Sequence, residues 1–130
     1  IPQVTTNIHG ITKQLCDENG FDMKEILLEL EKDLNNSDVF LAHNALFDFN
    51  ILCSELYRIG EKRLLKKLNN IMIKGNLCCS MLLMRMFIGC FKNPGLKQSY
   101  KYCFGCGPEN QHNAKFDVLA LVEIIKGRNN

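Results

Sequence analysis

The sequence lacks the features that would assign it to a membrane, secreted or strongly charged class. No apolar run approaches the roughly 20 residues of a membrane helix, and the first residues lack the basic-then-apolar pattern of a signal peptide. An excess of one charge is also missing, because 16 Lys and Arg oppose 14 Asp and Glu. The net charge of +2 is too small to indicate nucleic acid or a membrane by itself.

A disulfide framework is not indicated either. The seven cysteines form an odd number and follow no secretory signal, which favours free thiols in a reducing compartment. We therefore expect an intracellular protein, cytoplasmic or nuclear (or in the nucleoid), that is not secreted and has no membrane partner.

What is present is typical of a globular domain. The 130 residues are 46% apolar and 23% charged, which suits one domain or most of one and excludes a disordered tail or a fibrous protein. Strands and helices alternate along the chain, so we expect an α/β fold. The predicted elements are helices at about 22–35, 45–59, 80–87, 96–104 and 112–126, strands at 39–42 and 77–79, and irregular chain over 1–20 and 105–111.

The strand over 39–42 is a continuous apolar run, which is typical of a central strand covered on both faces. Only two strands are visible, and a stable open sheet needs at least one more. The helix over 45–59 carries an apolar stripe and ends at Gly60. The basic stretch over 61–68 is either a solvated helix face or a contact with a phosphate backbone.

The last helix carries a carboxylate where an apolar residue is expected. At about 100° per residue one face collects positions 114, 117, 118, 121, 122 and 125, and all except Asp117 are apolar. An isolated buried carboxylate costs several kcal/mol unless a cation or hydrogen-bond donors compensate it. Asp117 is therefore either a metal ligand or a group satisfied by buried hydrogen bonds.

Asp48 repeats this pattern in the first turn of the helix that follows the apolar strand. Its simpler explanation is a carboxylate favoured by the helix dipole. Two acids at helix starts near the sheet nevertheless indicate a shared site for a hard cation. His112 stands five residues before Asp117; it is either a surface or capping residue or a general base that activates water.

Three phrases and one shorter segment together resemble the DEDDh 3′–5′ exonucleases, which include the proofreading epsilon subunit of bacterial DNA polymerase III. In chain order they are Ile8-His9-Gly10-Ile11-Thr12, then Val39 to Asp48 (VFLAHNALFD), then Leu96-Lys97-x-x-Tyr100, and last His112-x-Ala114-x-x-Asp117. The resemblance, which rests on the order and spacing of these phrases, spans roughly residues 1–126, nearly the whole chain.

The resemblance implies a ribonuclease H-like exonuclease fold, a mixed sheet flanked by helices, that removes nucleoside monophosphates from 3′ ends. It implies that Asp48 and Asp117 bind two divalent metal ions, Mg²⁺ or Mn²⁺, and that His112 is the general base. It places Ile8, His9, Asn44 and Phe47 around the terminal nucleotide. The implied substrate is a single-stranded or frayed 3′ end of DNA, or of RNA, and the implied partner is a DNA polymerase.

The chain departs from the family pattern at its start. The family's first motif, Asp-x-Glu on the first strand, has no counterpart before Ile8. The expectation is therefore a single, partial exonuclease domain over 1–130 whose first strands are missing and whose own activity is weak. The segment Leu77-Cys78-Cys79-Ser80 also falls where many relatives carry Asp-Thr.

Two rival interpretations stay open. Cys103-x-x-Cys106 with His112 could supply three zinc ligands. Alternatively, the chain is a catalytically degenerate exonuclease-like module that binds single-stranded nucleic acid or a polymerase.

Overall fold

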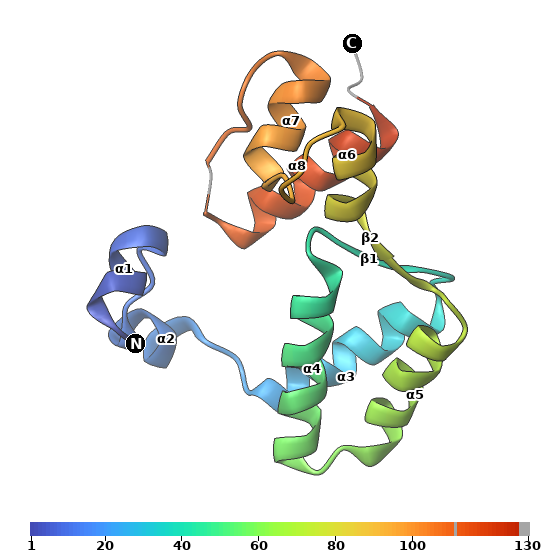
Figure 1. Cartoon of the computed structure of the whole chain (residues 1–130). Coiled ribbons are helices and arrows are strands. Elements are labelled where there is room, and N and C mark those ends of the chain that lie inside the picture. The colour runs from blue at the N-terminus through green and yellow to red at the C-terminus, as the bar shows by residue number, and fades with distance from the viewer. Residues whose placement is uncertain (111, 128–130) are drawn as a thin grey trace.

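The computed structural model describes residues 1–110 and 112–127 and has a largely helical architecture around one small sheet (Figure 1). In chain order its elements are α1 (Gln3–His9), α2 (Lys13–Asn19), α3 (Met23–Asn35), β1 (Phe40–Ala42), α4 (Ala45–Ile59), α5 (Lys62–Ile73), β2 (Leu77–Cys79), α6 (Ser80–Ile88), α7 (Leu96–Phe104) and α8 (Ala114–Lys126). None of the described helices has the length and apolar character that a membrane crossing requires.

The sheet joins two groups of helices. β1 and β2 are parallel, with Phe40 opposite Leu77 and Ala42 opposite Cys79. Parallel neighbours need a crossover connection, which α4 and α5 supply. Figure 1 shows α3, α4 and α5 on one side of the strands and α6, α7 and α8 on the other.

The main core lies among α3, α4 and α5. Its fully packed members come from all three helices: Leu27, Phe49, Leu56, Leu64 and Leu68. The stripe predicted for the second helix is confirmed, because Phe49 and Leu56 are buried and Leu52, Cys53 and Ile59 pack against them. Gly60 ends α4 in the left-handed conformation that a glycine adopts without steric cost.

The prediction of irregular chain over residues 1–20 is wrong. Local interactions stabilise each helix. In α1, Gln3 Nε2 donates to Asn7 Oδ1 at 2.9 Å; in α2, the Thr12 hydroxyl accepts the Leu15 N–H at 3.1 Å and Lys13 pairs with Asp17 at 2.7 Å. No residue of either helix is buried in the described structure, and Figure 1 shows both helices apart from the rest of the molecule. A helix-surface pair in α1, and a side-chain cap together with a helix-surface pair in α2, account for them rather than a buried face.

The prediction of a strand covered on both faces is also wrong within the described residues. β1 pairs there with β2 alone, and Leu41 at its centre is 36% exposed. Val39 and Leu41, which share one face of the run, are exposed, whereas Phe40 and Ala42 on the other face are half-buried, so only one face is covered. The ribonuclease H-like fold, with its larger mixed sheet, stays a prediction.

The orientation of α8 differs from the predicted face. Ala120 and Leu121 are its buried residues, whereas Val118 and Val122 of the predicted apolar face are exposed. The reason is packing against α7, where the Tyr100 hydroxyl donates to Glu123 Oε2 at 2.6 Å. That contact turns toward α7 a residue that the periodicity places on the solvent side.

Candidate functional site

His112 and Asp117 line one cavity of about 420 Å³. The other lining residues come from the start of α7 and the loop that precedes α8: Gly95, Leu96, Lys97 and Pro108. Two side chains that the sequence singled out from one phrase therefore face a common space. The cavity also receives Lys97, whose chemical role the sequence did not indicate.

Asp117 lies in the first turn of α8 and is half-buried. Its backbone N–H donates to the Asn113 carbonyl at 2.9 Å. Among the described residues its carboxylate has neither an ion pair nor a hydrogen bond, so the interpretation as a satisfied buried acid finds no support there. A half-buried carboxylate that faces a cavity is instead available to a cation.

His112 precedes the helix rather than capping it. The cap is Asn113, whose side chain accepts the Lys115 N–H at 3.1 Å. His112 itself has φ of +67°, a left-handed conformation that costs a non-glycine residue of order 1 kcal/mol or more. Strain of this kind is concentrated at functional sites, where surrounding structure maintains it.

Asp48 lies in the first turn of α4 and is half-buried. Burial raises the pKa of its carboxyl, and a hydrogen bond from its own backbone N–H opposes that rise. Asn44, the cap residue of α4, is left-handed at φ +71° and has no side-chain capping bond. Asp48 is not among the residues that line the cavity of His112 and Asp117. Its explanation as a carboxylate favoured by the helix dipole therefore stays open.

His43, which precedes the helix of Asp48, lies within hydrogen-bond distance of a residue next to the cavity. Its Nδ1 lies 2.9 Å from the Ser80 hydroxyl and its Nε2 lies 2.8 Å from the Pro94 carbonyl. Because a carbonyl can only accept, Nε2 is the donor, and in the neutral ring Nδ1 accepts from Ser80. Pro94 is buried and is followed by Gly95 at the cavity. The sequence analysis placed His43 inside a motif phrase but gave it no role.

Cys79, the last residue of β2, contacts the start of α4. Its Sγ accepts the backbone N–H of Ala45 at 3.4 Å. Burial by itself would raise the pKa of the Cys79 thiol, but hydrogen bonds from backbone N–H groups at the starts of α4 and α6 together lower it. Burial raises the pKa of the Cys53 thiol, by contrast.

The residues implied to surround the terminal nucleotide are distributed over several places. Phe47 is exposed and lines a second cavity of about 350 Å³ on α4. Ile8 and His9 belong to α1, where His9 Nδ1 accepts the Ile11 N–H at 2.9 Å. Neither of these two residues lines the cavity of His112 and Asp117.

No group of three His, Cys, Asp or Glu side chains able to hold a metal occurs among the described residues. The zinc interpretation with Cys103, Cys106 and His112 gains no support from this arrangement. For Mg²⁺ or Mn²⁺, the donor chemistry of Asp48 and Asp117 fits, since hard cations prefer carboxylate oxygens. The two acids lie on separate helices, so a shared metal site stays a prediction.

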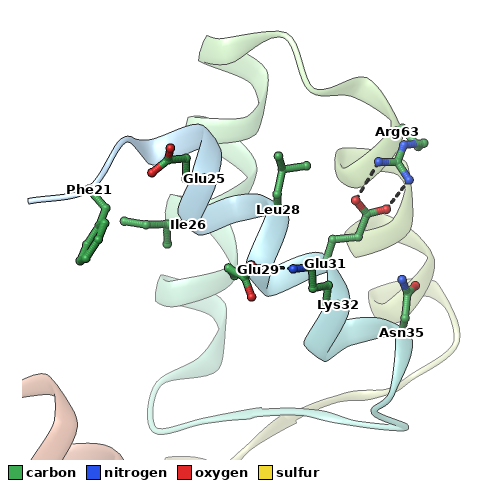
Figure 2. Close-up of a pocket in the computed structure, with 9 residues that line it drawn as sticks. All are labelled: Phe21, Glu25, Ile26, Leu28, Glu29, Glu31, Lys32, Asn35 and Arg63. Atoms are coloured by element: carbon green, nitrogen blue, oxygen red, sulfur yellow. Dashed lines mark hydrogen bonds and ion pairs between the residues drawn. The ribbon is translucent and has the colours of Figure 1, made fainter.

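A larger hollow, of about 880 Å³, lies on α3 and contains none of these residues (Figure 2). Phe21, Ile26 and Leu28 contribute apolar side chains to it. At its other end Arg63 contacts both oxygens of the Glu31 carboxylate, as the dashed lines in Figure 2 mark. Among the described residues no histidine lines this hollow, whereas the smaller cavity brings His112 and Asp117 together, so the smaller cavity is the better candidate for chemistry.

Comparison with known proteins gives a distant similarity to a DNA polymerase. The chain is 29% identical over 120 residues to the protein described as DNA polymerase III PolC-type of Listeria welshimeri. The similarity covers 92% of this chain but 8% of that protein, so the chain spans less than a tenth of the relative's length. No family model and no solved structure matches the chain. At this coarse level the similarity is consistent with a role connected with nucleic acid.

Proposed function

We propose that the chain forms part of a 3′–5′ exonuclease that releases nucleoside 5′-monophosphates from a single-stranded or frayed end. The observation that carries this proposal is the common cavity of His112 and Asp117. The distant similarity to a DNA polymerase III protein supports the same proposal, because the motif phrases resemble a proofreading family. We propose a ribonuclease H-like fold, two divalent metal ions and DNA as the first substrate to test, with RNA as the second.

His112 is the proposed general base of the reaction. A neutral imidazole near pH 7 can take a proton from the attacking water. The water oxygen then bonds to phosphorus, the bond from phosphorus to the 3′ oxygen of the preceding nucleotide breaks, and that oxygen gains a proton. The products are a nucleoside 5′-monophosphate and a strand that is one nucleotide shorter.

Asp117 and Asp48 are the proposed metal ligands. Divalent ions held by carboxylates would stabilise the charge that develops on the phosphoryl oxygens. The unpaired, half-buried carboxylate of Asp117 suits this role, and the raised pKa of Asp48 indicates a carboxylate that a cation would stabilise. Phe47 and Ile8 are proposed to contact the terminal nucleotide, since exposed aromatic and apolar side chains stack on any base. Asn44 is proposed to contact it as the resemblance implies.

The test is degradation of a 5′-labelled single-stranded DNA by the full chain with Mg²⁺ or Mn²⁺. Asp117→Asn and His112→Ala are each expected to reduce the rate at least about 100-fold. Asp33→Asn is the matched control, because Asp33 is an exposed acid on α3 outside the site. Full activity in both site variants contradicts the assignment.

A second candidate is a degenerate module that binds single strands without cutting them. It is favoured by the absence, among the described residues, of a group of three side chains able to hold a metal. Under this alternative, the wild-type chain and Asp117→Asn bind oligothymidylate equally, and neither shortens it. A metal-dependent ladder of products from the wild-type chain excludes this alternative.

A further inference from the structure

A lysine lines the same cavity as the proposed general base and metal ligand. Lys97 is the second residue of α7, is exposed, and lines the cavity together with His112 and Asp117. Neither Lys97 nor Asp117 belongs to an ion pair among the described residues, although both line this cavity. The opposite charges of the two side chains are therefore both available to a third group.

The other basic residues near the core are already engaged. Arg63 and Lys67 lie against Glu31, and Arg58 pairs with Glu55 at 2.6 Å. Lys101, one turn after Lys97 on the same helix, lines none of the described cavities. Lys97 thus differs from Arg63, Lys67 and Arg58 in having no ion pair among the described residues, and from Lys101 in lining the cavity.

The backbone at the start of α7 also favours a negatively charged ligand. Gly95 begins α7 and supplies no side chain to its first N–H groups, so the positive end of the helix dipole adds to the lysine charge. A cavity of about 420 Å³ is large enough for more than a single ion. The anion that combines small size, strong negative charge and relevance to phosphodiester chemistry is a phosphate group.

We propose that Lys97 binds a phosphate of the nucleic-acid strand in this cavity, beside the position at which His112 and Asp117 act. The inference rests on the proposed function, because it assigns the phosphate subsite of that same site. Lys97 is a binding residue: it neutralises substrate charge and takes no part in proton transfer.

The test uses the full chain and two probes, thymidine 5′-monophosphate and thymidine, titrated while backbone amide NMR signals are recorded. The monophosphate is expected to shift the signals of residues 96–99 and of Asp117, and Lys97→Gln is expected to weaken its binding about tenfold. Lys97→Arg restores most of the affinity, and Lys101→Gln, the matched control, changes it little. Unchanged monophosphate binding in Lys97→Gln, or an equal loss in Lys101→Gln, overturns the proposal.

Salt dependence gives a second measurement on oligothymidylate. Removal of one phosphate contact makes the slope of log K against log [NaCl] less negative by about 0.7. Lys97→Gln is expected to show this change and Lys101→Gln is not; identical slopes overturn the proposal. Loss of phosphate binding in Lys97→Gln, with no effect of His112→Ala or Asp117→Asn on hydrolysis, refutes the proposed roles of His112 and Asp117 and retains the phosphate subsite at Lys97.

Discussion

Arg63 provides a direct test of whether the basic stretch over 61–68 is structural or binds a phosphate backbone. Its guanidinium donates to both oxygens of Glu31, one of them at 2.7 Å, as Figure 2 shows. Glu31 is 8% exposed and belongs to the buried side of α3. Lys67 lies 3.7 Å from the same carboxylate. The perturbation is Arg63→Met, which retains much of the side-chain length and removes the charge.

The magnitude follows from the burial of each partner. Removing one partner of a fully buried ion pair costs about 3–5 kcal/mol, because it leaves a charge without compensation. The Arg63 side chain is 71% exposed, so solvent screens much of this pair. Lys67 also stays to compensate Glu31 in the variant. We therefore expect the free energy of unfolding to fall by about 1–2 kcal/mol.

The assay is urea unfolding at neutral pH and low salt, followed by circular dichroism. Lys62→Met is the matched control, since Lys62 is exposed and forms no ion pair among the described residues. It should change the free energy of unfolding by less than about 0.5 kcal/mol. Oligothymidylate affinity is measured in parallel on folded protein. Unchanged stability of Arg63→Met, together with a large loss of affinity, refutes the structural interpretation and favours the phosphate contact.

Three further predictions follow from burial and ionisation. Leu56→Ala, at a fully buried position of α4, should reduce the free energy of unfolding by about 3 kcal/mol in urea, whereas Leu46→Ala, at a 55% exposed position, should cost under about 1 kcal/mol; equal losses contradict the core assignment. The Asp48 pKa is raised in the folded state, so the fold binds this proton more tightly than the unfolded chain does, and stability falls as pH rises from the unfolded value through the folded pKa. When the free energy of unfolding, taken from denaturation curves recorded from pH 3 to pH 7, is plotted against pH, Asp48→Asn should lack that part of the slope. Parallel plots for the wild-type chain and Asp48→Asn contradict the prediction. With N-ethylmaleimide near pH 8, mass spectrometry should find Cys79 modified before Cys53, because their thiol pKa values are shifted in opposite directions; the reverse order contradicts the role of the backbone donors.

The elements with clear local signals could be predicted from the sequence. The bounds of α4 and α7 agree with the predicted 45–59 and 96–104, because an apolar periodicity or a glycine-bounded segment defines each one. Gly60 and Gly105 end these helices in the left-handed conformation. Such signals lie within the element itself, so tertiary contacts are not needed to read them.

Features that depend on tertiary packing could not be predicted in the same way. The exposed Val122 and the engaged Glu123 of α8 follow from its contact with Tyr100 of α7, which periodicity cannot reveal. The same distinction between local signals and tertiary packing applies to the residues of the candidate site. His112 and Asp117 come from one phrase, whereas Lys97 joins them only because α7 packs on α8.

The central claim is that Asp48 and Asp117 belong to one divalent-metal site. Titration with Mn²⁺ tests it most directly, because the paramagnetic ion broadens the amide NMR signals of residues near it. We expect the signals around both acids to broaden over the same concentration range, and Asp117→Asn to remove the broadening at both positions. Broadening at one acid alone, or at neither, contradicts the shared site.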